Sequence, residues 1–303
     1  MTSAVSSLCR LALATGALAL AGGAALAAPA LDLYYERALM SAADARCRLF
    51  EPQLGAALAS AQAQARGAAL RAGATEDAIA QTKKVAVARA GSVACASADL
   101  TVAAGRVRAA FQSFSRLQRM TYAGELAPWK AVRVASANAV TWRLSQGAIM
   151  GRDKAVLGLA ASGRLAPGLA VAGGFSDGSW PYSARLVLRD PARSPRAQIG
   201  RIAIDPKAKV PLAQRLPPRA GVRVIMPEAR TLADPALAPT GIKAAILFRF
   251  PVAAADLIEA LDPREAVAVE FLFADRDRDQ VRTAYFEVGD FSAGRAFLRV
   301  PAR

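Results

Sequence analysis

Gly174-Phe-Ser-Asp-Gly178 is the stretch of this sequence with the spacing of a nucleophilic site, G-x-S-x-G. In α/β-hydrolases this pattern places a serine on a tight turn between a strand and a helix, and a histidine elsewhere in the chain activates it. Here the chain has no histidine, and the Ser-Trp-Pro-Tyr that follows Gly178 is a poor start for a helix. We therefore favour a Gly/Ser turn over a histidine-free hydrolase with Ser176 as its nucleophile.

The absence of histidine restricts the chemistry of the whole chain. Histidine is the commonest general base near neutral pH and the commonest metal ligand. Asp275-Arg-Asp-Arg-Asp279 has the alternating acids of a calcium loop, but Gln280 and Phe286 stand where that loop needs Gly and Glu. We interpret residues 275–279 as a solvated hairpin turn, and we expect no catalytic residue, no metal site and no cofactor.

The N-terminus carries the pattern of an export signal. Arg10 precedes an apolar run of Leu, Ala and Gly, and Ala25-Leu-Ala27 stands directly before Ala28. A charged start, an apolar stretch and an Ala-x-Ala site are typical of a secretory signal peptide. We predict that residues 1–27 are removed by cleavage between Ala27 and Ala28; a retained membrane anchor is the alternative. The mature chain is expected to have no transmembrane segment.

Export would leave two cysteines, Cys47 and Cys95, in a compartment where disulfides persist. Cys47 lies 26 residues before Gly73 and Cys95 lies 22 residues after it. In an antiparallel helical hairpin folded at Gly73, the two side chains would reach similar heights. We predict a disulfide between them. Two buried free thiols are the alternative, and a reactive thiol assisted by the neighbouring arginines is a weaker one.

Residues 28–126 are predicted to form a helical hairpin or bundle. Apolar residues recur at steps of three and four from Leu39 to Ala65, which indicates one face of a helix with a kink or a restart at Pro52. A second helix is expected from Thr75 towards Leu100, where Thr75 is followed by acids as at a helix start. A further apolar pattern, formed by Val107, Phe111, Phe114 and Leu117, continues into a third segment or extends the second.

Residues 127–303 are predicted to form a β-rich domain. Short β-type runs separated by Gly and Pro lie at 138–146, 154–162, 183–190, 221–228, 242–250, 266–273 and 281–288. Short helices are expected at 252–261 and 289–298. The predicted fold class is therefore α+β, an N-terminal antiparallel helical hairpin followed by a mostly antiparallel β-rich domain with short helices.

The chain is strongly basic, with 39 Lys and Arg against 24 Asp and Glu. Residues 143–230 hold 15 basic and 5 acidic residues, and this segment could attract an anionic partner. The charges are scattered singly, so we favour solvated faces. A basic patch is the usual footprint of nucleic acid, but nucleic acid is not the partner expected for an exported chain.

The C-terminal stretches ADLIEALDPREAVAVEFLF (255–273) and VRTAYFEVGDFSAGRAFL (281–298) resemble the closing pattern of the invasion-associated locus B family. The resemblance implies an exported bacterial protein with a β-rich fold and no established enzymatic activity. It covers about a fifth of the chain. The paired cysteines of that family are absent from this region, and the helical front part is not explained by it.

These features together predict the localisation of the protein more specifically than its function. We expect a periplasmic or envelope-associated protein that works as a non-enzymatic binding or structural module. Its partner would be an unknown envelope protein or an anionic envelope component. A carrier of an anionic or lipidic ligand is the alternative.

Overall fold

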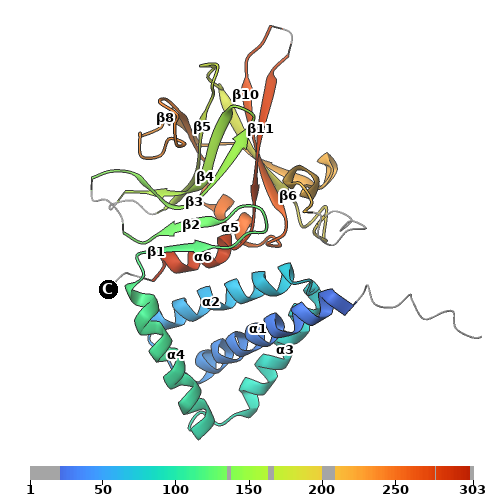
Figure 1. The fold of residues 1–303 in the computed structure, drawn as a ribbon, viewed down its shortest axis with the longest axis vertical. Helices are drawn as coiled ribbons and strands as arrows, with labels where there is room; N and C mark the ends of the chain where they lie inside the picture. Colours follow the sequence, from blue (N-terminus) through green and yellow to red (C-terminus); the bar gives the residue numbers. More distant parts are fainter. Residues whose placement is uncertain (1–20, 135–137, 163–166, 200–208, 277, 301–303) are drawn as a thin grey trace, which may run out of the picture.

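The computed structural model describes residues 21–134, 138–162, 167–199, 209–276 and 278–300 (Figure 1). The helices are α1 (Ala21–Cys47), α2 (Pro52–Arg71), α3 (Glu76–Ser92), α4 (Ala98–Arg116), α5 (Ala253–Glu259) and α6 (Phe291–Leu298). The strands are β1 (Arg119–Tyr122), β2 (Trp129–Val132), β3 (Thr141–Met150), β4 (Asp153–Ala161), β5 (Gly168–Gly174), β6 (Ser183–Arg189), β7 (Val222–Ile225), β8 (Ala229–Leu232), β9 (Ile246–Arg249), β10 (Ala266–Phe273) and β11 (Gln280–Glu287). Helices come first and antiparallel sheets follow, which confirms the predicted α+β class.

The helical layer is built around α1, which packs against both α2 and α3. The chain reverses direction at residues 48–51, where Arg48 adopts a positive φ of 54°, and Pro52 then starts α2 at a position where its missing N–H costs nothing. The restart at Pro52 is therefore correct. The prediction that the helices on either side of Gly73 pack mainly against each other is wrong. Helices α2 and α3 have few contacts with each other, and both pack on α1.

The second expected helix is also divided. Thr75 caps α3 by accepting a hydrogen bond from the Ala78 N–H, as its sequence context predicts, but α3 ends at Ser92. Ser97 caps α4 in the same way by accepting from the Leu100 N–H. The apolar pattern of residues 107–117 therefore belongs to a separate helix, α4, and not to an extension of α3.

The predicted disulfide between Cys47 and Cys95 is present, with the two Cα atoms 5.6 Å apart. Its position differs from the expected one. Cys47 is the last residue of α1, and Cys95 lies in the connection between α3 and α4, so the bond joins a helix end to a loop. The disulfide thereby fixes the end of the helical layer from which α4 departs.

The β-rich part consists of two antiparallel sheets. A seven-stranded sheet has the order β1-β2-β3-β4-β5-β9-β8, and a four-stranded sheet has the order β11-β10-β6-β7. Side chains from both sheets share one hydrophobic core, which includes Leu144, Leu157, Phe248, Phe271 and Phe286. The two sheets therefore pack face to face, and this arrangement is what positions the loops at their ends.

Helix α6 connects the helical layer to the sheets, lying between α2 and strands β1 to β3 (Figure 1). Ser60 of α2 donates a hydrogen bond from its Oγ to the Ala293 carbonyl oxygen at 2.8 Å. The seven-stranded sheet begins at Arg119, before the expected boundary at residues 126 and 127, which falls between β1 and β2. No helix in the described part of the chain has the length and hydrophobicity that crossing a membrane requires.

Candidate functional site

The G-x-S-x-G stretch follows β5 directly and forms a loop, not a strand-to-helix turn. Phe175 anchors the loop by packing edge-to-face against Phe271 and Phe273, with ring centroids 5.2 and 4.8 Å away. The Ser176 N–H and Oγ–H both donate to Asp153 Oδ1, at 2.8 and 2.9 Å. Gly178 has a φ of +73°, a conformation that glycine adopts without strain, and this residue lets the chain turn.

Arg282 of β11 holds this loop from the other sheet. Its guanidinium donates to Asp153 Oδ2 at 3.0 Å and to Asp177 Oδ2 at 2.5 Å. It also lies over the ring of Phe273, 4.5 Å from the centroid. The hydrogen bond from Arg282, followed by those from Ser179, lowers the pKa of Asp177. The loop of residues 175–180 is therefore fixed by two carboxylates that share one arginine, and we call it the clamped loop.

This geometry supports the interpretation of Ser176 as part of a turn. A serine nucleophile needs a base that can take its proton. The acceptor here is Asp153, whose Oδ1 already accepts two hydrogen bonds from Ser176 and whose Oδ2 is bound by Arg282, so the carboxylate is engaged on both oxygens. The Ser176 hydroxyl thus anchors the loop to β4.

A cavity of about 260 Å³ lies beside the clamped loop. Its walls include Ser176, Ser179 and Trp180 from the loop and Lys243 from the segment before β9. The close approach of the two walls depends on Gly174, because a Cβ there would come within 2.3 Å of Ile242 Cγ2. The Lys154 ammonium donates to the Thr240 carbonyl oxygen at 2.8 Å and anchors the second wall. Both walls of the cavity are therefore fixed, the clamped loop by Asp153 and Arg282 and the segment before β9 by Lys154.

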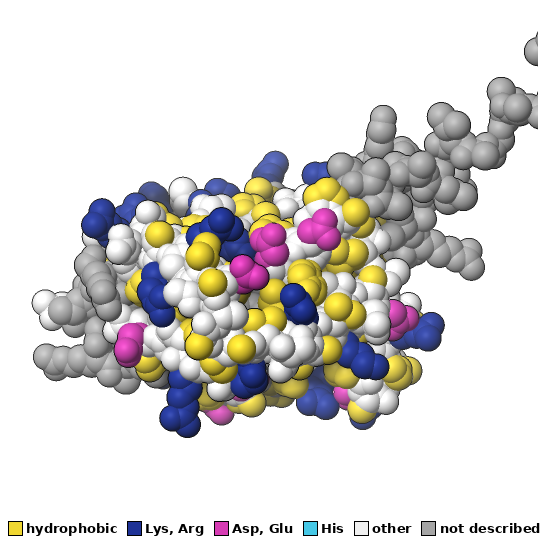
Figure 2. All heavy atoms as spheres, turned by 90° about the horizontal axis from the view of Figure 1, so that it is seen from below, with side chains coloured by type: hydrophobic (Ala, Val, Ile, Leu, Met, Phe, Trp, Pro, Cys, Tyr) yellow, Lys and Arg dark blue, Asp and Glu magenta, His cyan; other side chains and the backbone are white. Residues whose placement is uncertain are grey.

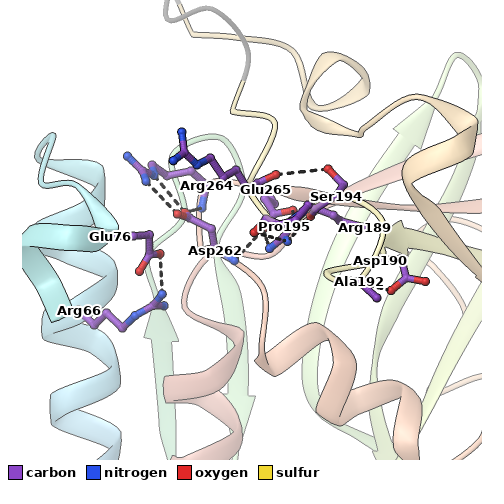
Figure 3. A network of polar contacts seen from close by, with 11 residues as sticks. Arg66, Glu76, Arg189, Asp190, Ala192, Ser194, Pro195, Asp262, Arg264 and Glu265 are labelled. Carbon is purple, nitrogen blue, oxygen red and sulfur yellow. Dashed lines mark hydrogen bonds and ion pairs between the residues drawn. The ribbon is translucent and has the colours of Figure 1, made fainter.

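A second, larger cleft of about 480 Å³ lies between the helical layer and the sheets (Figure 3). Arg66 of α2 pairs with Glu76 of α3 at 2.7 Å on one side of it. On the other side, Arg189 of β6 holds the buried Glu265 through two hydrogen bonds of 2.6 and 2.9 Å. Asp262, three residues before Glu265, faces the helical layer, and Arg264 binds it.

Two carboxyl groups meet across this cleft. Glu76 and Asp262 share a hydrogen bond, and burial is the main cause that raises the pKa of Glu76. Burial also opposes ionisation of Asp262, but hydrogen bonds from the side chain and backbone of Arg264 outweigh it and lower the pKa of Asp262. Glu76 is therefore the group that keeps a proton to higher pH. Each acid of this polar network has an arginine partner. The network therefore connects the helical layer to the sheets.

A third hollow, of about 360 Å³, lies between α1, α2 and α4. Its walls are mainly apolar and include Met40, Leu58 and Phe111, while two arginines and one acid, Arg37, Arg106 and Glu36, give it a net positive charge. Figure 2 looks onto the helical layer from below and shows hydrophobic side chains spread over this face among Lys and Arg side chains. An apolar hollow with charged neighbours suits an amphipathic ligand.

The remaining predicted residues have simpler surroundings. Ala27 and Ala28, the predicted cleavage site, lie within α1, so a mature chain would begin inside this helix. In the predicted turn 275–279, Asp275 accepts a hydrogen bond from Gln280 and Asp279 accepts one from Tyr182, while residue 277 lies outside the described residues. Residues 1–20 also lie outside them.

Sequence reasoning missed the residues that build the clamped loop. Arg282 is 105 residues from Asp177, and nothing in either local pattern relates them. Trp180 comes two residues after the G-x-S-x-G stretch and could have been recognised as a large aromatic residue beside a Gly/Ser turn. Lys243 gives no signal, because it stands in an otherwise ordinary β-type run.

Comparison of the chain with protein-family models, curated proteins and solved structures gave no match. The resemblance of residues 255–298 to the invasion-associated locus B family stays a prediction. The functional argument therefore depends on the geometry described above.

Proposed function

We propose that this chain is an exported protein of the periplasm or cell envelope that works by binding, without catalysing a reaction. The observation that carries the proposal is the Cys47–Cys95 disulfide. Disulfides persist in oxidising compartments and are rare in the cytosol. The signal-like N-terminus gives an independent reason for the same location.

The surroundings of the reactive side chains support binding over catalysis. Ser176 donates to an ion-paired carboxylate, and the acids in the cleft of Figure 3 are held by arginines. A catalytic acid or base needs a proton affinity matched to its task and access to a substrate. Ion-paired, bonded groups of this kind suit a scaffold that presents surfaces to a partner.

The test is the intact mass of the protein purified from its own cells, with thiols alkylated before and after reduction. We expect a chain that begins at Ala28 and whose thiols react only after reduction. A full-length chain with freely reacting thiols would contradict the proposal, since it would leave the protein in a reducing compartment or on a retained anchor.

A second candidate function is the carriage of a lipidic ligand with an anionic group. The hollow between α1, α2 and α4 favours it, because apolar walls would bury the chain and Arg37 and Arg106 would attract the charge. Native mass spectrometry of the purified protein would show such a lipid as an adduct. Ala110→Trp, which fills the hollow, should remove the adduct, while Ala109→Trp, whose residue does not line it, should leave it.

A further inference from the structure

The three tryptophans of the chain have different environments. Trp129 is fully buried and donates from its indole N–H to backbone carbonyls of residues 287 and 288. Trp142 donates in the same way to the Leu237 carbonyl oxygen at 3.1 Å. Trp180 is 47% exposed, and its indole N–H has no acceptor among the described residues. It is the tryptophan whose ring face and donor are both available to a ligand.

Lys243 stands on the opposite wall of the same cavity. Its side chain is exposed and forms no ion pair with any residue that the structure describes. Lys154 of β4 is bound to the Thr240 carbonyl oxygen, whereas the Lys243 ammonium has no partner among the described residues. The cavity therefore combines one aromatic face with one unpaired positive charge.

The clamped loop holds Trp180 in place before any ligand arrives. Asp153 fixes Ser176, Asp177 fixes Ser179 through its N–H and Oγ–H, and Arg282 joins the two carboxylates. A loop that is ordered in the free protein loses little conformational entropy on binding, which favours affinity. Holding Trp180 in place is therefore a role for these hydrogen bonds and ion pairs, for which we found no catalytic role.

We propose that this cavity binds the ring of an acidic saccharide, with a sugar face on Trp180 and the carboxylate or phosphate of the sugar on Lys243. The aromatic face offers a flat apolar surface, and the indole N–H offers a donor for a hydroxyl oxygen. The hydroxyl groups of Ser176 and Ser179 add polar contacts along the loop. A volume of about 260 Å³ holds a single sugar ring better than a bulky apolar ligand.

The choice of an acidic saccharide from the envelope rests on the proposed function, because an exported chain would meet envelope glycans. The binding chemistry itself can be tested without reference to location. A failure of binding would overturn the ligand assignment alone, while the mass measurement above tests export separately.

The experiment is calorimetric titration of the disulfide-intact protein with three probes. Trigalacturonate carries carboxylates, glucose 6-phosphate carries a phosphate, and the methyl ester of trigalacturonate is the neutral match. We expect at least one anionic probe to bind about tenfold more tightly than the neutral probe, and its affinity to fall as salt is added. The stronger anionic probe identifies which of the two groups is recognised.

Variants locate the site. Trp180→Ala and Lys243→Gln should each weaken binding of the anionic probe by about tenfold. Tyr182→Ala and Lys84→Gln are the matched controls, since Tyr182 is equally exposed without lining the cavity and Lys84 lies on α3. Equal binding of charged and neutral probes, no binding of any probe, or full binding by both cavity variants would each overturn the proposal.

Discussion

Several arginine side chains of this protein are buried and form ion pairs in the interior. Among the described residues, Arg189 and Arg215 have side chains that are only 8% and 1% exposed. Arg189 holds Glu265, and Arg215 binds Glu125 and the Arg264 carbonyl oxygen. The basic excess of residues 143–230, which we interpreted as solvated faces, therefore lies partly in the interior. Buried carboxylates persist only when they are paired in this way.

Glu76 leads to a prediction about pH. Its pKa is raised above 4.5 in the folded protein, so the folded state binds more protons than the unfolded state just above this pH. The stability that Glu76 contributes is therefore present below pH 4.5 and is lost as the pH rises through the raised pKa. Glu76→Gln keeps a donor towards Asp262 at every pH. We expect the stability of the wild type relative to this variant to fall with rising pH above 4.5.

Chemical denaturation at a series of pH values measures this difference. The Arg66–Glu76 pair is partly exposed, so its loss in the variant should add an offset of only about 0–1 kcal/mol. Asp262 has a lowered pKa and changes stability in the opposite direction below its ordinary value of 3.8, outside this window. Parallel pH profiles for the two proteins would contradict the raised pKa of Glu76.

At the scale of elements, the contact between α2 and α6 is the junction of the molecule. Gly67 allows it, because a Cβ at this position would lie 2.0 Å from Asp290 Oδ1. One turn later, Arg71 binds both oxygens of Asp290 at 2.7 and 2.9 Å. Burial raises the pKa of Asp290, and the bond from Arg71 offsets part of that cost. Small and charged residues therefore dock these two helices together.

Two alanine substitutions separate this docking role from helix propensity. Gly67→Ala should lower the free energy of unfolding by about 1–3 kcal/mol, because the new methyl group forces α2 away from Asp290. Gly105→Ala, in the interior of α4 with open space around it, should raise it by about 0.5–1 kcal/mol. Denaturant titration of both variants checks the pair. A stabilising Gly67→Ala would show that the helices do not touch closely there.

The elements that the sequence predicted well have strong local patterns. The 266–273 run is almost continuously apolar, the 281–288 run contains Val, Tyr and Phe, and they became β10 and β11 within one residue. Strand β5 was missed, because Gly-Leu-Ala-Val-Ala-Gly-Gly has three glycines, one β-branched residue (Val171) and no aromatic residue, which is a weak strand pattern. The clamped loop was missed for another reason, since the contact that orders it is between sheets. The disulfide was predicted correctly, but the prediction assumed a helix that continues from Cys47 to Gly73. In the structure α1 ends at Cys47 and the chain reverses before Pro52.

At the scale of the whole molecule, the protein consists of a helical layer and a pair of sheets with α6 between them (Figure 1). The helical layer has two small hydrophobic cores, while the sheets have one large core and a smaller cluster that includes Ala170 and Leu247. The disulfide closes a span of 48 residues within the helical layer alone. The layer with the smaller cores is thus the one that carries the covalent bond.

Replacing both cysteines should therefore weaken the helical layer first. We expect Cys47→Ser with Cys95→Ser to lower the free energy of unfolding by about 2–4 kcal/mol. All three tryptophans lie beyond residue 128, so their fluorescence reports the sheets while far-ultraviolet circular dichroism also reports the helices. In the double variant, the dichroism transition should precede the fluorescence transition. Coincident transitions at wild-type denaturant concentrations would contradict this role of the bond.

The position of α6 also determines when the fold can be completed. Helix α6 follows all the other described elements in the sequence, yet contacts at its start and within it reach back 233 residues to Ser60 and 219 residues to Arg71. A ribosome or a translocation channel that releases the chain from its N-terminus would present the helices long before their docking partner exists. The complete structure can therefore form only after residues 290–293, which make these contacts, have emerged.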